Sequence, residues 1–278
     1  MKKILFALPL LSLCFVACDP AEEEAPAMPK SVSSEELKSV VTIQQVVKNQ
    51  NKIRVTTTPS TFVHVCDQDG NLLASGTDCD IIGIPPLTEI VVKSRNLDGS
   101  EAVVKQPVSI TEYVDVPAIY SNLFGSSFTQ QVWTWDTSGG VVMGNGAYME
   151  GTADFQNRWW NIAPADLQGQ CDEKGYPNDG LDATMTFILA GKKFETSSGR
   201  KGTISWDLTN IVKEGWSQGK LTFNNAVPLL GIQFNGGGAP FYEYDILHMD
   251  GEKLCICAPE PGAGDWGTAW FWNFAVKK

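Results

Sequence analysis

Short runs of alternating apolar and polar residues, separated by turn residues, fill the chain from about residue 39 to residue 117. A period of two is typical of β-strands that bury one face. The runs expected to be strands are Lys52–Thr58, Phe62–Cys66, Glu89–Ser94, Glu101–Lys105 and Val108–Ile110. The connections Asp67–Asn71 and Asn96–Ser100 carry Asp or Asn with glycine, the residues that form tight turns. The pattern predicts a small β-sandwich for residues 39–117.

Residues 118–278 form a second domain that is richer in aromatic residues. All nine tryptophans lie at or after Trp133. The expected strands are Val132–Asp136, Ala183–Leu189, Gly202–Leu208, Lys220–Phe223, Tyr242–Met249, Lys253–Cys257 and Trp270–Val276. This number of strands predicts a larger jelly-roll or β-sandwich, so the whole chain is expected to be all-β.

Two strands of the second domain predict which aromatic side chains form its core. Trp270, Trp272 and Phe274 alternate along the last expected strand, so they share one face. Trp133 and Trp135 share a face in the same way. We expect all five rings to be buried.

The chain begins with a different hydrophobic pattern. Lys2 and Lys3 precede an apolar run, Ile4–Val16, that is too short to span a bilayer and is typical of a signal peptide. The run ends in Phe15-Val16-Ala17-Cys18, which resembles a bacterial lipobox. We therefore expect residues 1–17 to be removed and Cys18 to be acylated, which anchors the chain durably. The alternative is an ordinary secretory signal followed by a chance cysteine.

Residues 18–38 are expected to form a flexible, lipidated tether, because the tract after Cys18 is rich in charge and proline. Its cluster Glu22–Glu24 resembles the export signal of surface lipoproteins in Gram-negative bacteria that use polysaccharides. The expected location is the outer membrane, facing the cell exterior. The alternative is a solvated linker with the domains in the periplasm.

The charge of the chain excludes one class of partner. The formal net charge is −11, and it becomes −13 when the signal peptide removes Lys2 and Lys3. Phosphate binding needs a basic field, so we expect no nucleic-acid partner. Asp67, Asp69 and Asn71 have the alternate spacing of a calcium loop, but no Glu follows at the required distance, and a plain turn is expected.

Family resemblance sharpens the two-domain prediction. In the first domain, Asp69–Gly70, Val91–Gly99 and Val108–Ile110 follow one another as in PKD-type immunoglobulin-like spacer domains. The second domain resembles the C-terminal domain of PKD-containing surface lipoproteins of polysaccharide-utilisation systems. That resemblance rests on Leu123–Gly125, Val132–Asp136, Gly144–Gly146, Trp159–Trp160, Asp179, Ala183–Phe187, Tyr244–Leu247 and Trp270–Phe274. It implies a non-catalytic binder of polysaccharide or oligosaccharide, comparable with a carbohydrate-binding module, that needs no cofactor.

Sugar binding needs a flat ring on which the C–H face of a pyranose can stack, with polar groups beside it. Arg158-Trp159-Trp160-Asn161 supplies two rings, a guanidinium and an amide in one stretch expected to be a loop. Its alternative is that a tryptophan of the pair closes the end of the sandwich. Further loop candidates for the same site are Tyr148, Tyr176, Asp179, Trp216 and Trp266.

Catalysis is not indicated by any motif. A glycosidase needs two carboxylates across a cleft, and the many acidic residues mark no pair. The histidines, His64 and His248, lie in alternating strand patterns, and no Gly-x-Ser-x-Gly occurs. Besides glycan binding, two functions stay open: an adhesive lipoprotein that binds protein partners, such as an outer-membrane transporter, and a hydrolase whose carboxylates meet only in the fold.

Five cysteines follow Cys18: Cys66, Cys79, Cys171, Cys255 and Cys257. In an oxidising compartment an odd number leaves at least one thiol free or paired with another chain. Cys66 could pair with Cys79, and Cys171 with either of the remaining two. Buried free thiols are the alternative, and Cys-x-Cys alone is half a zinc site.

Overall fold

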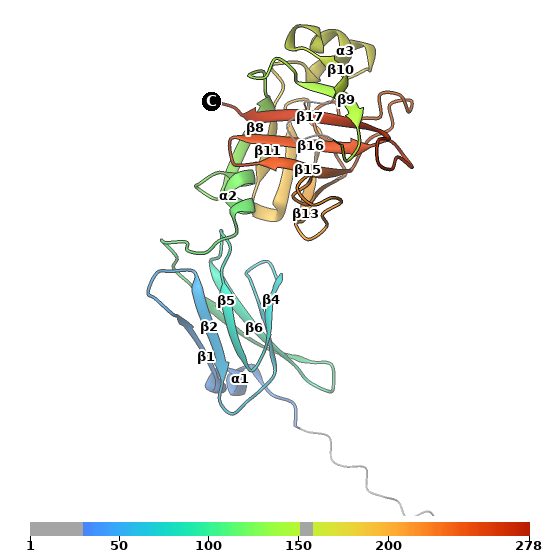
Figure 1. Cartoon of the computed structure of the whole chain (residues 1–278). Helices are drawn as coiled ribbons and strands as arrows, with labels where there is room; N and C mark the ends of the chain where they lie inside the picture. Colours follow the sequence, from blue (N-terminus) through green and yellow to red (C-terminus); the bar gives the residue numbers. More distant parts are fainter. Residues whose placement is uncertain (1–29, 151–157) are drawn as a thin grey trace, which may run out of the picture.

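The computed structural model describes residues 30–150 and 158–278, which form two β-rich domains joined by the segment 108–117 (Figure 1). The all-β prediction is confirmed. Cys18, the signal peptide and most of the expected tether lie outside the described residues. Within those residues, no helix has both the length and the apolar character needed to cross a membrane.

The first domain begins with a short helix, α1 (Ser34–Val40). Ser33 and Glu36 form a capping box, in which the Ser33 hydroxyl accepts from the Glu36 amide and the Glu36 carboxylate accepts from the Ser33 amide. Leu37 is fully buried in the core of the domain. The end of the predicted tether, residues 34–38, is therefore folded.

Two sheets enclose the core of the first domain. One holds β1 (Val41–Gln45), β2 (Lys52–Thr57) and β5 (Asp78–Ile82), and the other holds β4 (Leu72–Gly76), β3 (Val63–Cys66), β6 (Glu89–Arg95) and β7 (Glu101–Pro107). Side chains of both sheets, such as Val55 and Val92, belong to a single buried cluster. The alternating patterns predicted β2, β3, β6 and β7 but not β1, β4 and β5, and Val108–Ile110 is not a strand.

The turns of the first domain follow the predicted chemistry. Gly70 and Gly99 both have positive φ. The Asp67 carboxylate accepts from the backbone amides of Asp69 and Asn71 and from the Asn71 side chain. Its oxygens are thus engaged within the turn.

The second domain is a closed barrel of eight antiparallel strands with a two-strand extension (Figure 1). In order around the barrel the strands are β8 (Gln130–Trp135), β11 (Met185–Ile188), β12 (Lys193–Thr196), β13 (Lys201–Asp207), β14 (Lys220–Asn224), β15 (Glu243–Met249), β16 (Lys253–Pro259) and β17 (Thr268–Val276). The extension is β9 (Met143–Ala147) and β10 (Arg158–Ile162). The helical elements are α2 (Ala118–Phe124), η1 (Pro164–Asp166), α3 (Leu167–Glu173), η2 (Pro177–Asp179) and η3 (Ala190–Lys192).

Strand β17 both closes the barrel and carries the extension. Its second half pairs with β8, where Phe274 lies opposite Trp135. Its first half pairs with β9, from Thr268 to Trp272, and β9 in turn pairs with β10. One strand therefore has two different neighbours along the same edge.

The predicted jelly-roll or β-sandwich is wrong for this domain. A jelly roll needs long connections that cross between two sheets. From β11 to β17 each strand instead pairs with the next strand in sequence, and β17 returns to β8. Seven of the eight barrel strands matched predicted runs. The short strand β12 was missed, because its four residues offer only Phe194 and Thr196 as inward positions.

The barrel interior is filled by large side chains. Trp133, Trp135, Trp270, Trp272 and Phe274 are all buried in its core, as predicted from their alternation. The long segment between β14 and β15, residues 225–242, adds further apolar side chains: Leu229, Leu230, Ile232, Phe234 and Phe241. This segment closes one end of the barrel.

A buried ion pair holds that closing segment in place. Asp179, fully buried, accepts two hydrogen bonds from the Arg200 guanidinium, at 3.0 and 2.8 Å. The same carboxylate accepts from the Leu230 amide at 2.8 Å. The Leu230 carbonyl in turn accepts from the Trp272 indole at 3.1 Å. The amide of Leu230 therefore bonds Asp179 while its carbonyl bonds Trp272 of β17, and these two hydrogen bonds fix the closing segment at Leu230.

We expect Asp179→Ala to lower the free energy of unfolding by about 3 kcal/mol, because it leaves the Arg200 charge without its partner in a site that is mostly buried. Urea unfolding at neutral pH measures the loss. Asp182→Ala is the matched control, since Asp182 is exposed three residues away. Equal stability of the two variants would contradict the assigned role.

Candidate functional site

Three residues form a row across the extension of the barrel. Asn145 of β9 lies opposite Trp270 of β17 on one side and opposite Trp160 of β10 on the other. Residues directly opposite each other in antiparallel strands present their side chains on the same face. The face that is core inside the barrel therefore continues outward through Asn145 to Trp160.

Burial decreases along this row. Trp270 is 2% exposed and Trp160 is 40% exposed. Phe234 of the closing segment stacks on Trp270, with ring centroids 4.7 Å apart and planes at 25°. Trp160 meets Trp270 edge-on at 6.1 Å and lies 6.3 Å from Phe234. Buried rings thus support an indole that presents part of its surface to solvent.

Polar groups surround the rings. A hollow of about 370 Å³ is lined by Asn145, Trp160, Gln170, Glu173, Lys174, Phe234, Asn235 and Trp270. The Lys174 ammonium pairs with Glu173 at 2.9 Å and lies 5.5 Å from the centre of the Phe234 ring. The Trp270 indole N–H donates to the Glu260 carboxylate at 2.6 Å.

One acceptor in this hollow has no partner. The side-chain oxygen Oδ1 of Asn145 is buried and receives no hydrogen bond. A buried acceptor without a donor costs about 1–3 kcal/mol. The oxygen has almost no accessible surface, so a ligand in the hollow does not reach it while the Asn145 side chain keeps this orientation.

The pair Trp159–Trp160 lies in strand β10, not in the expected loop. The pairing of β10 with β9 shifts register between Arg158 and Trp160, so Trp159 is the extra residue of a bulge. The bulge leaves both adjacent indoles accessible, Trp159 at 55%. Asn161 is exposed on the same strand. The backbone of Arg158 pairs with that of Gly146. The Arg158 side chain lies outside the part of the chain that the structure describes.

The structure does not bring the other candidates to this site. Trp266 is 63% exposed, in the turn before β17, and does not line the hollow. Tyr176 is partly buried with the Arg200 guanidinium 5.5 Å from its ring centre. Asp179 is the buried ion-pair carboxylate described above. The prediction that it is a surface loop residue is wrong, because its charge is used to hold the closing segment.

Tyr148 and Trp216 were also expected on the surface, and both are buried. They belong to a second cluster with Leu247, Cys255, Cys257, Ala269 and Phe271. Alternation places this cluster on the face of β15, β16 and β17 opposite the barrel core. Tyr148 meets Trp216 edge-on at 5.4 Å. Their rings are used for packing, so neither offers a stacking face.

A carboxylate lies beneath this second cluster. Asp245, 1% exposed, accepts from the Tyr148 hydroxyl at 2.8 Å through Oδ2. Its Oδ1 has no hydrogen bond, and the Lys220 ammonium is 3.9 Å away. Burial raises the pKa of the Asp245 carboxyl above its ordinary value.

The cysteines do not form disulfides within the described chain. Cys66, Cys79, Cys171, Cys255 and Cys257 are all buried, and none of them is in a disulfide. Neither pairing considered from the sequence is present. Burial raises the pKa of the Cys171 thiol to about 12, so this thiol is a poor nucleophile and metal ligand. No group of three His, Cys, Asp or Glu side chains within residues 30–150 and 158–278 is arranged to hold a metal ion.

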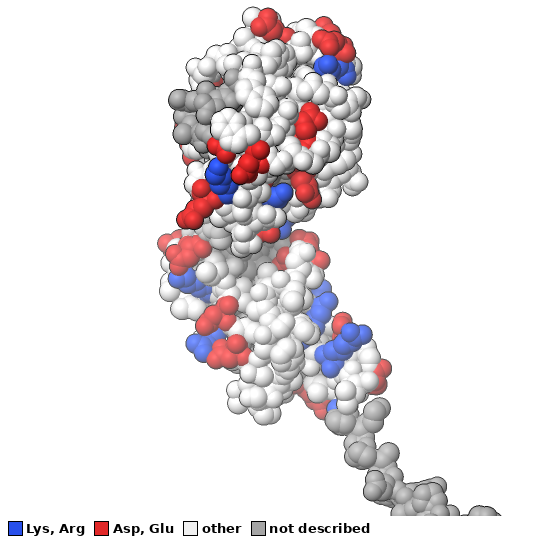
Figure 2. Space-filling model, turned by 45° about the vertical axis from the view of Figure 1, so that its right-hand side comes forward, with Lys and Arg blue, Asp and Glu red and all other residues white. Residues whose placement is uncertain are grey.

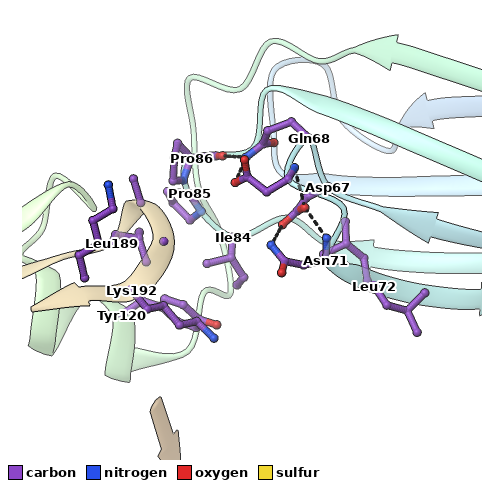
Figure 3. Close-up of a pocket in the computed structure, with 15 residues that line it drawn as sticks. Asp67, Gln68, Asn71, Leu72, Ile84, Pro85, Pro86, Tyr120, Leu189 and Lys192 are labelled. Atoms are coloured by element: carbon purple, nitrogen blue, oxygen red, sulfur yellow. Dashed lines mark hydrogen bonds between the residues drawn. The ribbon is translucent and has the colours of Figure 1, made fainter. Parts of the chain in front are cut away.

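A second hollow, of about 680 Å³, lies between the two domains (Figure 3). Several of its polar groups are already engaged. Asp67 is bonded within its own turn, and Gln68 bonds the Pro86 carbonyl and the Thr88 amide. The Lys192 ammonium lies 4.8 Å from the centre of the Trp206 ring. This hollow therefore has fewer groups available to bind a ligand than the site beside Trp160.

Surface charge is mixed. On the face in Figure 2, acidic and basic side chains are interspersed over both domains, and most of the barrel surface is uncharged. Such a surface suits a neutral ligand better than a polyanion.

Sequence reasoning found Trp159 and Trp160 but missed the residues that complete the site. Asn145, Phe234 and Trp270 come from three separate segments, and Trp270 was assigned to the core alone. Gly144-Asn145-Gly146 has no apolar alternation, so β9 was not expected, and without β9 the row cannot be assembled. No protein-family model matches the chain, and no curated protein shows significant similarity to it.

The raised pKa of Asp245 predicts a pH-dependent contribution to stability. The folded protein holds this proton to a higher pH than the unfolded chain, whose carboxyl ionises near pH 4. The contribution is therefore most favourable below about pH 4 and is lost as pH rises through the raised pKa. We expect Asp245→Asn to gain stability relative to wild type between pH 4 and pH 7.

Urea unfolding of both proteins at the two pH values measures this difference. Asn keeps an acceptor for the Tyr148 hydroxyl, so the comparison isolates the charge. Asp182→Asn at an exposed position should leave the pH dependence unchanged. A constant stability difference between Asp245→Asn and wild type at both pH values would refute the prediction.

Proposed function

We propose that this protein is a lipid-anchored surface protein that binds polysaccharide or oligosaccharide without altering it. The observation that carries the proposal is the exposed Trp160 indole, which packs against Trp270 and Phe234. A pyranose has an apolar C–H face that can stack on the ring and hydroxyls at its rim that polar side chains can bind. Asn235, Gln170 and Lys174 add polar groups around the same hollow.

Binding without catalysis suits the carboxylates beside the rings. Glu173 is paired with Lys174, and Glu260 accepts from the Trp270 indole. A glycosidase needs one carboxyl as proton donor and a second as base or nucleophile across the scissile bond. The engaged carboxylates favour recognition over hydrolysis.

The first domain has the role of a spacer in this proposal. Two sheets of three and four strands around one core agree with the immunoglobulin-like, PKD-type architecture that the sequence resembles. Helix α1 lies at the end of this domain that is remote from the barrel (Figure 1). A lipid on Cys18 would therefore hold the barrel at a distance from the outer membrane. The barrel would face the cell exterior, and it could contact an outer-membrane transporter.

We expect Trp160→Ala to weaken glycan binding at least tenfold, because a truncated tryptophan at the centre of a site costs about 2 kcal/mol. Affinity electrophoresis through gels that contain plant or host polysaccharides measures the loss, after wild type identifies the glycan that retards it. Trp159→Ala and the double variant rank the two indoles.

Phe62→Ala is the control, because Phe62 is an exposed aromatic ring in the first domain, at 60%. It should migrate like wild type. If wild type migrates freely through every gel, glycan binding is refuted and a protein partner becomes the better explanation. Release of reducing sugar by wild type would instead show hydrolysis.

The anchor is tested separately from the site. Cys18→Ser should move the protein from the detergent-soluble membrane fraction to the aqueous fraction, because the thiol that takes the diacylglycerol is lost. Mass spectrometry of the wild-type N-terminal peptide should show the added acyl chains. An unmodified Cys18 in membrane-derived protein would rule out the lipoprotein assignment.

A further inference from the structure

Another hollow adjoins the 370 Å³ hollow at Trp160. It has a volume of about 450 Å³ and is lined by Trp160, Asn161, Ile162, Ala165, Asp166, Gly169 and Gln170. Trp160 and Gln170 line both hollows. The exposed Trp160 indole therefore borders both hollows.

Helix α3 gives the two hollows an order. Asp166 and Gly169, at its first turn, line the 450 Å³ hollow, and Glu173 and Lys174, at its last turn, line the 370 Å³ hollow. Gln170 lies between them and contributes to both. The two spaces thus follow one another along α3, which lies next to β10 (Figure 1).

Gly169 borders the 450 Å³ hollow. A Cβ atom built at this residue would meet no heavy atom within 4 Å outside its own helix. Glycine inside a helix is less favourable than almost any other residue. No packing contact explains glycine here, and its effect is to leave room in the hollow.

We infer that the site binds an extended oligosaccharide that crosses Trp160 and fills both hollows, in preference to a single sugar. This inference rests on the proposed function. Each hollow lies within the size range of small-ligand pockets. The loss of translational and rotational freedom is incurred once for a ligand that fills both, so affinity rises until both spaces are occupied.

The experiment uses residues 18–278 with Cys18→Ser, which keeps the whole mature chain in solution. The probes come from partial hydrolysis of the polysaccharide that retards wild type, separated by number of sugar units. Isothermal titration calorimetry gives the affinity of each fraction. The affinity should rise at least about tenfold from one unit to the shortest chain that fills both hollows and then reach a plateau.

Gly169→Phe tests which space the longer chains use. A helix accommodates phenylalanine better than glycine, and its ring would enter the 450 Å³ hollow. The variant should lose the gain in affinity with chain length. Gly264→Phe is the matched control, since Gly264 also has open space at Cβ, has no positive φ and lines neither hollow.

The outcomes separate the inference from the function. Equal affinity of wild type for one unit and for longer chains would overturn the two-hollow inference and leave glycan binding standing. A folded Gly169→Phe that keeps the length dependence would overturn it as well. If no polysaccharide retards wild type, the proposed function falls and takes this inference with it. The wild-type length series needs no variant to fold.

Discussion

The divided pairing of β17 is the constraint on which the site depends. A barrel closes when its last strand pairs with its first, and β17 does this with β8 only from Phe274 to Val276. From Thr268 to Trp272 the same edge pairs with β9. Because the inward face of β17 continues across β9 and β10, core rings and solvent-accessible rings form one surface. A barrel closed along the full length of β17 would have no such surface.

The packing around β17 holds the rings of this surface in place. The Trp272 indole donates a hydrogen bond to the Leu230 carbonyl. The Leu230 amide donates to Asp179, which is paired with Arg200. This chain of contacts positions the closing segment, whose Phe234 stacks on Trp270. Rings fixed in this way lose little freedom when a ligand arrives. The unpartnered oxygen of Asn145 is the feature that packing alone does not explain.

The sequence predicted the β class, most strands and the buried rings, because alternation reports directly which face a residue occupies. Alternation did not predict the position of residues whose burial or place in the site depends on a neighbour from a distant segment. Tyr148 and Trp216 were expected in surface loops, but both are buried in a second cluster on the outer face of the barrel. Asn145 joins the site only through its register with Trp270. The barrel replaced the jelly roll because strand order is set by pairing and not by strand number.

We expect Trp160 to contact the glycan, and the indole N–H signals of ¹⁵N-tryptophan-labelled protein report this contact. The spectrum of Trp160→Phe assigns the Trp160 signal among the nine tryptophans. On addition of the glycan that retards the protein, that signal should shift while those of buried Trp133, Trp135 and Trp272 stay in place. A Trp160 signal that stays unchanged at saturating glycan would show that Trp160 does not contact the glycan.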